Sequence, residues 1–237
     1  MSRSMMLGLV LPVCGFGLVA CVPVEPGDGA IPATDEDAVQ EVVLPEAAHT
    51  GRASLEEAIV GRRSLRSFGA EPLRLEDVAQ LLWATQGVTD TSRGLRTAPS
   101  AGATYPLETY LVAGDVSGLT AGIYRYDPRT HRLAQTGAGD VRNDLAAAAL
   151  SQSFIAEAPA SIVIACAYAR TEQRYGDRAE RYVHMEAGHA AQNLALQAVS
   201  LGLGTVPVGA FRDDPVAALL ELPAEEEPLY ILPIGRP

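Results

Sequence analysis

An arginine-rich segment is the densest group of cationic side chains in an otherwise acidic sequence. Arg62, Arg63 and Arg66 lie close together in the chain, with Ser64 and Ser67 between and beside them. A planar guanidinium donates two parallel hydrogen bonds to phosphate oxygens, and the hydroxyls can add more. The segment is therefore suited to hold a phosphate group. A solvated positive turn between two helices would have the same composition, so both interpretations stay open on these residues alone.

Two other segments combine glycine, proline and small side chains. Residues 98–106 run between two prolines and would let a flat ligand approach the main chain closely. Residues 201–210 carry glycines that close a long helix and do not follow a strand, so they are not a dinucleotide-binding fingerprint. A backbone N–H near residues 208–210 could point at a ligand atom. Ordinary surface turns have similar compositions.

The composition excludes several kinds of chemistry. The chain has 237 residues with 18 basic and 29 acidic side chains, a net charge of −11, which argues against nucleic acid as a partner. All the basic residues are arginine, so a phosphate-loop lysine, a Schiff-base lysine and a lysine base are excluded. Three cysteines without a CxxC motif and four histidines give no zinc-ligand spacing.

The helices and strands expected from the sequence alternate irregularly. A capping box, Ser54 to Glu57, predicts a helix that reaches Gly61, and apolar periodicity predicts another from Leu75 to Gln86. A long helix is expected from about residue 181 to 201, and Asp214 with Pro215 is expected to cap and open a last short one. Strands are expected at 109–113, 161–167 and 229–234, with a hairpin of 122–126 and 131–135. This order favours an α+β fold.

Taken together, these segments resemble the nitroreductase superfamily of flavin enzymes, and within it the SagB-type, or thiazole/oxazole-forming, dehydrogenases. The resemblance covers about residues 44–237. It is carried by Arg62-Arg63-Ser64-x-Arg66, Pro99-Ser100-Ala101-Gly102-Ala103-x-Tyr105-Pro106, Glu186-Ala187-Gly188-His189-x-x-Gln192-Asn193-Leu194 and Tyr230-x-x-Pro233-Ile234-Gly235-Arg236-Pro237. It implies an α+β fold with a central, mostly antiparallel sheet flanked by helices, an intertwined homodimer, and FMN at the dimer interface.

The resemblance also implies roles for particular residues. The flavin phosphate and ribityl chain would be held by Arg62, Arg63, Ser64 and Arg66. The partner subunit would reach the flavin with Pro99, Ser100 and Ala101. The isoalloxazine ring would be lined by Pro207, Val208 and Gly209, with a backbone N–H near N5. Hydride transfer is then the chemistry of the cofactor itself, and the protein orients the reacting groups and supplies the electrostatic field around them.

The sequence departs from the family at two places. Many members carry Lys and Arg near the C-terminus that help bind phosphate, and here Arg236 is the one candidate. Azoline-oxidising members have a Lys-Tyr pair where this chain has Arg174-Tyr175. A guanidinium cannot act as a base near neutral pH, so Tyr175 is the candidate catalytic residue.

Other chemically capable residues are expected to be structural. His184 and His189 lie at i and i+5 of one helix and so do not form a metal pair. His189 is expected to be packed and hydrogen-bonded, and Glu186 to pair with Arg181 or Arg178. No metal site is expected. Cys166 lies in a buried strand and is expected to be an inert small hydrophobe.

The N-terminal segment is interpreted as a targeting signal. A basic residue, a short apolar run and Leu-Val-Ala before Cys21 are typical of a lipoprotein signal peptide, residues 1–20, with Cys21 as the lipidated residue. The absence of Asp after Cys21 is similar to lipoproteins sent to an outer membrane, so an extracytoplasmic, lipid-anchored location on the periplasmic face is expected. Residues 21–48, acidic and proline-rich, are expected to be a flexible tether, and residues 49–237 the flavin-binding domain.

Three functions remain open from the sequence. The first is an FMN-dependent oxidoreductase acting on a small molecule or peptide, with its direction unassigned, because NAD(P)H is scarce outside the cytoplasm. The second is a non-catalytic lipoprotein that binds a flavin or another small ligand on the same fold. The third is an ordinary reductase in the cytoplasm, which applies if the start codon is assigned too early and the apparent signal peptide is not translated.

Overall fold

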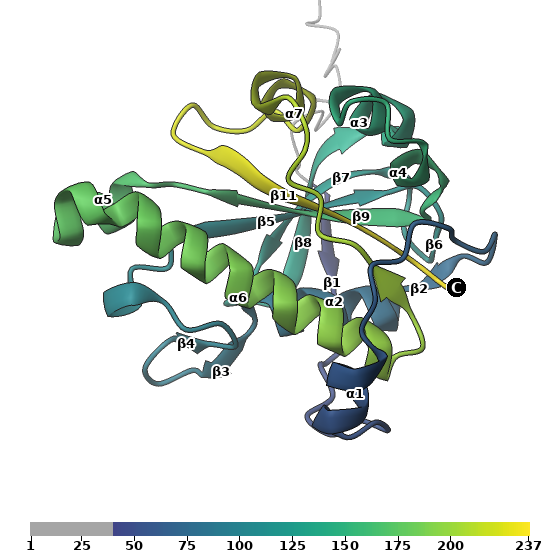
Figure 1. Ribbon diagram of the computed structural model, residues 1–237, viewed down its shortest axis with the longest axis horizontal. Helices are drawn as coiled ribbons and strands as arrows, with labels where there is room; N and C mark the ends of the chain where they lie inside the picture. The colour runs from purple at the N-terminus through teal and green to yellow at the C-terminus, as the bar shows by residue number, and fades with distance from the viewer. Residues whose placement is uncertain (1–39) are drawn as a thin grey trace, which may run out of the picture. The chain divides into compact units, whose positions relative to one another are not determined.

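The computed structural model describes residues 40–237, so the expected signal peptide, Cys21 and the tether up to residue 39 lie outside the described residues. Seven strands form one sheet in which every neighbouring pair is antiparallel (Figure 1). In their order across the sheet they are β1 (Glu41–Val43), β8 (Arg132–Ala138), β7 (Gly122–Asp127), β5 (Leu107–Ala113), β9 (Ala160–Cys166), β11 (Glu227–Gly235) and β10 (Gly204–Thr205). The expected α+β fold with an antiparallel sheet is confirmed.

The centre of the sheet is buried on both faces. Every residue of β9 is buried, and this strand pairs with β5 on one side and β11 on the other. Its β-branched and small residues suit a strand without a solvent face. Burial raises the pKa of the Cys166 thiol to about 12, so this cysteine is inert, as expected.

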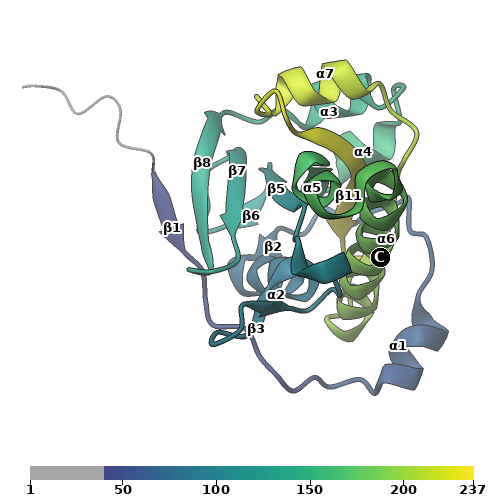
Figure 2. The same ribbon diagram turned by 90° about the vertical axis from the view of Figure 1, so that its left-hand side faces the viewer.

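Helices cover both faces of the sheet (Figure 2). On one face α2 (Leu75–Gln86) and α6 (Ala179–Ser200) pack against the strands, with α1 (Leu55–Gly61) against α6. On the other face lie α3 (Arg142–Ala148), α4 (Ser153–Glu157) and α7 (Asp213–Leu219). α5 (Ala169–Tyr175) and a 3-10 turn, η2 (Gly176–Arg178), lead into α6, and a second 3-10 turn, η1 (Ala101–Ala103), precedes β5. Two small ribbons are formed by β2 (Leu73–Arg74) with β6 (Val116–Ser117) and by β3 (Val88–Asp90) with β4 (Leu95–Arg96).

The predicted elements are present with some corrections. The capping box of α1 is confirmed, because Glu57 N–H donates to Ser54 Oγ (3.1 Å) and Ser54 N–H to the Glu57 carboxylate (2.7 Å). The prediction for α7 was wrong in detail: this helix begins at Asp213, and Arg212 is its N-cap without a side-chain hydrogen bond. Asp214 therefore lies in the first turn.

The folded part begins earlier than residue 49. β1 pairs with β8, and Leu44 after it is buried. The last residues of the stretch expected to be tether thus extend the sheet, because Val42 and Leu44 find an apolar surface to cover. Among the residues described, no helix is long and apolar enough to cross a membrane.

Candidate functional site

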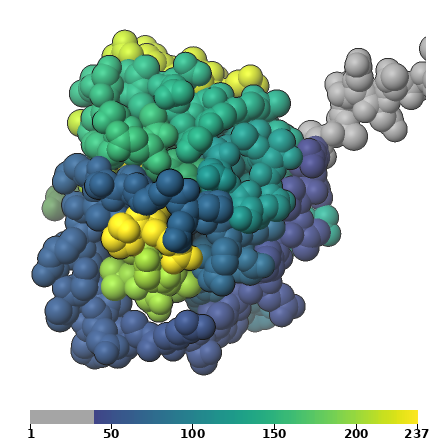
Figure 3. Space-filling view, turned by 90° about the vertical axis from the view of Figure 1, so that its right-hand side faces the viewer, coloured from purple at the N-terminus to yellow at the C-terminus, as the bar shows by residue number. Residues whose placement is uncertain are grey.

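The arginine-rich segment lies beside the turn that follows α6. Ser64 bridges to Thr205, and Leu65 N–H donates to the Thr205 carbonyl (3.1 Å). Gly204 permits this approach, because a Cβ there would collide with the Leu65 side chain. Two of the three segments singled out in the sequence are therefore neighbours. In Figure 3 the C-terminal residues, in yellow, lie between blue residues of the first part of the domain and lime residues near position 200.

The guanidiniums of this segment differ in availability. Arg63 folds back and donates to the Val60 and Arg62 carbonyls (2.8 and 2.7 Å) at the end of α1. Arg62 and Arg66 have no carboxylate partner in the part of the chain that the structure describes, although the chain carries 29 acids. Arg66 lies 5.9 Å from the centre of the Phe154 ring. Two unpaired guanidiniums and the exposed Ser64 hydroxyl are thus available to an anion.

Arg236 lies near this segment but is engaged elsewhere. Its carbonyl accepts from Gly69 N–H (3.0 Å), which places the C-terminus beside the chain that follows Arg66. Its guanidinium pairs with Glu71 (3.1 Å) and lies 3.8 Å from a carboxylate oxygen of Asp77. A phosphate would have to compete with these two carboxylates, so Arg236 is a weaker candidate than Arg62 or Arg66.

In the turn at residues 207–209, Pro207 and Gly209 are accessible to a ligand, whereas Val208 is not. Val208 exchanges two backbone hydrogen bonds with Ile231 (2.8 and 2.9 Å), and its side chain is buried. The Val208 N–H is therefore not available to a ligand. Pro207 and Gly209 are exposed, and Gly209 N–H has no backbone acceptor within residues 40–237. Gly209 is the better candidate for the donor expected near the flavin ring.

The loop of residues 99–106 is held in an unusual conformation. Gly102 has φ +58°, and the non-glycine residues Ala103 and Tyr105 have φ of 54° and 45°. Left-handed backbone at non-glycine residues costs free energy and persists only where surrounding contacts enforce it. Tyr105 N–H donates to the Ser100 hydroxyl (2.9 Å), which closes the loop on itself.

α5 supplies the contacts that enforce this conformation. Arg170 donates to the Tyr105 carbonyl and Arg174 to the Gly102 carbonyl, each at 3.0 Å. A Cβ on Gly102 would lie 2.6 Å from the Tyr175 hydroxyl, so this hydroxyl packs directly on the loop. The structure therefore brings the candidate catalytic residue Tyr175 together with the loop that carries Pro99, Ser100 and Ala101.

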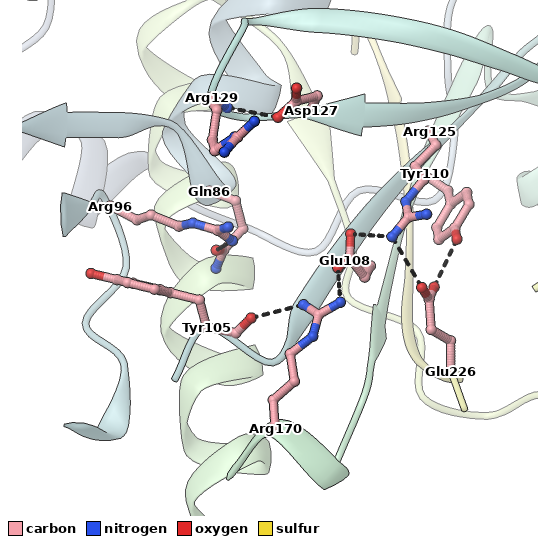
Figure 4. Close-up of polar contacts among 10 residues, drawn as sticks. All are labelled: Gln86, Arg96, Tyr105, Glu108, Tyr110, Arg125, Asp127, Arg129, Arg170 and Glu226. Carbon is pink, nitrogen blue, oxygen red and sulfur yellow. Dashed lines mark hydrogen bonds and ion pairs between the residues drawn. The ribbon is translucent and has the colours of Figure 1, made fainter. Parts of the chain in front are cut away.

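A network of ion pairs ties α5 to the sheet (Figure 4). Glu108 of β5 bridges Arg170 (2.5 Å) and Arg125 (3.0 Å). Arg125 also reaches Glu226 (3.2 Å), which accepts a hydrogen bond from the Tyr110 hydroxyl (2.7 Å). Burial raises the pKa values of Tyr110 and Glu226. The arginine that holds the loop is thus fixed by the sheet beneath it.

Arg96 approaches the same loop from β4. It donates to Gln86 (2.9 Å) and lies 4.7 Å from the centre of the Tyr105 ring, a cation–π distance (Figure 4). Burial lowers the pKa of Arg96, while the charges of Glu108 and Glu186 oppose that shift.

The prediction for the environment of Glu186 was wrong. It does not pair with Arg178 or Arg181; its side chain is 2% exposed and directed into the protein. Burial raises its pKa to about 7, against a hydrogen bond from Ser100 and the charge of Arg96, which lower it. Its Oε1 makes no hydrogen bond to any residue described. Its place in the motif Glu-Ala-Gly-His was the signal that could have drawn attention to it.

The prediction for one of the two histidines of α6 was also wrong. His184 Nε2 lies 2.6 Å from the Tyr168 hydroxyl. His189 was expected to be packed and hydrogen-bonded but is exposed, and makes no hydrogen bond within the described part of the chain. The reason is its position on the side of α6 that faces away from the sheet.

The candidate residues form two groups at the two ends of α6. The loop of residues 99–106 lies by Glu186, while Gly61, at the start of the arginine-rich segment, touches Val199. Thirteen residues of helix separate these contacts, about 20 Å along its axis. Gly61 and the loop of residues 99–106 therefore contact α6 at places about 20 Å apart along its axis.

Known proteins are similar to this chain in fold and in sequence. The profile described as “Nitroreductase family” matches residues 59–236. “Putative nitroreductase MJ1384” of Methanocaldococcus jannaschii is 47% identical over 196 residues, 83% of this chain and 96% of that protein. A crystal structure with the same description, from Ralstonia eutropha, superposes with a TM-score of 0.73 at 32% identity, over 83% of this chain and 89% of the other.

A more distant relative has a different name. The trifolitoxin-processing protein TfxB of Rhizobium leguminosarum bv. trifolii is 33% identical over 145 residues, which are 55% of this chain and 38% of that protein. The chain therefore spans little more than a third of that relative. The family match covers most of the chain, one relative is 47% identical over 83% of it, and a solved structure shares its fold: the chain belongs to the nitroreductase family.

Proposed function

We propose that this protein is an FMN-dependent oxidoreductase of the SagB type. The observation that carries the proposal is the pair of guanidiniums, Arg62 and Arg66, without a carboxylate partner among the described residues, in a segment that pairs through Ser64 with Thr205, just before the exposed Gly209 in the chain. In this arrangement Arg62, Arg66 and Ser64 hold the flavin phosphate, and Pro207 and Gly209 line the ring. Bound FMN supplies hydride transfer through its N5 atom.

The site requires a second copy of the chain. The loop that carries Pro99, Ser100 and Ala101 contacts α6 about 20 Å along its axis from the place where Gly61, at the start of the phosphate-binding segment, contacts it. This separation supports a site that the partner's loop completes. Apolar side chains remain exposed on α1 and α6, where a second copy would cover them: Leu55, Ile59, Val60 and Met185 are 61, 55, 71 and 47% exposed. A homodimer with two flavin sites follows, and the loop of residues 99–106 is called the flavin-contact loop below.

Tyr175 is the residue proposed to move a proton. Its hydroxyl lies against the flavin-contact loop, whereas the Arg174 guanidinium is bound to the Gly102 carbonyl and stays charged. We assign to Tyr175 the donation or acceptance of the substrate proton that accompanies hydride transfer. We propose a peptide or a small aromatic molecule as the substrate, and one relative is named for trifolitoxin processing.

The test is a visible absorption spectrum of residues 22–237, with mass identification of the molecule released on denaturation. About one FMN per chain is expected, together with a dimer in solution. Arg62→Gln and Arg66→Gln should each weaken FMN binding roughly tenfold, while the exposed control Arg129→Gln should not. A colourless protein that fails to take up FMN would refute the proposal. Stoichiometric FMN that no donor or substrate reduces would favour the non-catalytic alternative.

The location is a separate proposal. The signal peptide, Cys21 and the acidic tether support a lipid-anchored protein outside the cytoplasm, with the outer membrane as its site. Metabolic labelling with a palmitate analogue should mark the wild-type chain and not the Cys21→Ala variant. Label that persists in the variant would contradict lipidation at Cys21, and a wild-type chain that takes no label would favour the third possibility, a cytoplasmic reductase.

A further inference from the structure

Two arginines near the flavin-contact loop each lie over the ring of a tyrosine. The Arg174 guanidinium lies 5.7 Å from the centre of the Tyr175 ring. The Arg178 guanidinium lies 5.7 Å from the centre of the Tyr182 ring, and both are cation–π distances. The two rings meet edge to face, with their centres 5.0 Å apart. These four side chains are called the Arg–Tyr cluster below, and they lie where α5 and η2 lead into α6.

One end of the Arg–Tyr cluster touches the flavin-contact loop. Arg174 donates a hydrogen bond to the Gly102 carbonyl (3.0 Å). A Cβ on Gly102 would lie 2.6 Å from the Tyr175 hydroxyl and 2.9 Å from the central carbon of the Arg174 guanidinium. A group bound to the cluster would therefore lie next to the loop that reaches the flavin in the proposed dimer.

The guanidiniums of the cluster are open to an anion. Arg174 and Arg178 are exposed, and neither has a carboxylate partner within residues 40–237. Arg174 uses one N–H on the Gly102 carbonyl, whereas Arg178 donates no hydrogen bond to the residues that the structure describes. Three exposed acids on the same segment form no ion pair with either arginine: Glu172, Asp177 and Glu180.

A ring beneath a guanidinium orients it for binding an anion. The ring covers one face of the guanidinium plane and restricts the side chain, while the N–H groups at the edge of the plane stay free. Less conformational entropy is then lost when a carboxylate accepts two parallel hydrogen bonds. Because the chain has a net charge of −11 and repels anions at long range, arginines held in this way are needed to bind one.

We propose that Arg174 and Arg178 form a recognition site for a carboxylate of the substrate. This inference rests on the proposed function, and it narrows the substrate to an anion, either a small aromatic acid or a peptide with an acidic side chain. Because Tyr175 belongs to the cluster, a carboxylate bound there holds the rest of the substrate beside the hydroxyl proposed to move the proton.

The experiment is a titration of the FMN-loaded protein with 4-fluorobenzoate and with its neutral counterpart 4-fluorobenzamide, followed by fluorine NMR line width. The wild type should bind the acid about fivefold more tightly than the amide. Arg178→Gln should lose most of this preference, and Arg174→Gln should act in the same direction. The matched control Arg181→Gln removes an equal charge from an exposed position on α6 that lies over no ring in the described part of the chain, and it should follow the wild type.

A second measurement follows the reaction without a natural electron donor. The flavin is reduced chemically under anaerobic conditions and then reoxidised by 4-nitrobenzoate or 4-nitrobenzamide. Arg178→Gln should lower the second-order rate constant for the acid about fivefold and leave that for the amide unchanged. The unchanged amide rate shows that the variant is folded and holds its flavin.

A further pair of probes distinguishes the two sources of the carboxylate. A capped peptide with one glutamate, and the same peptide with glutamine, compete with 4-fluorobenzoate. Displacement by the glutamate peptide at a lower concentration than by unlabelled benzoate assigns the site to a peptide. The reverse order assigns it to a small aromatic acid.

The outcomes separate the two proposals. If the wild type takes up no FMN, the proposed function fails and this inference falls with it. If FMN binds but the acid and the amide bind equally, the Arg–Tyr cluster does not recognise a carboxylate and this inference alone is overturned. Equal losses of preference in Arg178→Gln and Arg181→Gln would overturn it as well, because the effect would then come from net charge.

Discussion

Replacing Glu186 by glutamine should change how the stability of the protein depends on pH. The pKa of Glu186 is raised in the folded protein, chiefly by burial. A group of this kind favours folding most strongly below its unfolded pKa, and the contribution is lost as the pH rises through the folded pKa. The wild-type protein should therefore lose stability between about pH 4.5 and about pH 7 through this residue, whereas Glu186→Gln should not.

The magnitude follows from the two pKa values. With 4.5 for the ordinary carboxyl and about 7 for Glu186 in the folded protein, linkage gives a loss of about 2.5 kcal/mol of unfolding free energy between about pH 5 and about pH 8. The Glu186 side chain is almost fully buried, so solvent does not screen this contribution. The fixed cost of a buried amide is the same at every pH, and it cancels when the two conditions are compared.

The assay is urea unfolding of both proteins at several pH values, at one fixed protein concentration because a dimer's stability depends on it. The difference in unfolding free energy between Glu186→Gln and the wild type should grow by about 2.5 kcal/mol in favour of glutamine from about pH 5 to about pH 8. The exposed control Glu180→Gln should parallel the wild type. Parallel profiles for Glu186→Gln, within about 0.5 kcal/mol, would show that the pKa of Glu186 is not raised in the folded protein and would refute this reasoning.

Three further outcomes are expected. Gly102→Ala should lower the unfolding free energy by roughly 1–3 kcal/mol, since its φ of +58° disfavours a side chain and its Cβ would press on the Tyr175 hydroxyl; thermal melting measures this. Arg170→Gln should cost about 1–2 kcal/mol in a urea titration, because it breaks the ion pair with Glu108 and a hydrogen bond to the loop. The Cys166 thiol should resist a thiol reagent in the native protein and react after unfolding, as its raised pKa and burial dictate.

The elements with strong local signals could be predicted from the sequence. The capping box of α1 and the apolar run of β9 are set by neighbouring residues, and both are where they were expected. α3 and α5 were missed, because neither has a side-chain N-cap and each owes its helix to packing. β1 was missed because it forms only where β8 offers an edge.

The candidate site shows the same division. Spacing identified the arginine-rich segment, yet it could not show which guanidiniums are free. The carboxylates that engage Arg236 lie far away in sequence, at Glu71 and Asp77. Likewise Glu186 was expected to pair with arginines nearby on its own helix. Its burial depends on how α6 meets the loop of residues 99–106, which is a tertiary contact that no local pattern encodes.

The arrangement along α6 implies that dimerisation and flavin binding are coupled. If each flavin needs the arginine-rich segment of one protomer and the flavin-contact loop of the other, FMN binds the dimer and not the monomer. Mass action then requires that FMN tighten the dimer by the same factor by which dimerisation tightens FMN. Dilution of the protein without FMN should release monomers at a higher concentration than dilution with saturating FMN, as analytical ultracentrifugation would measure. If the dissociation constant of the dimer does not depend on FMN, each chain completes its flavin site alone. That result would contradict the inference drawn from the separation of the two contacts on α6.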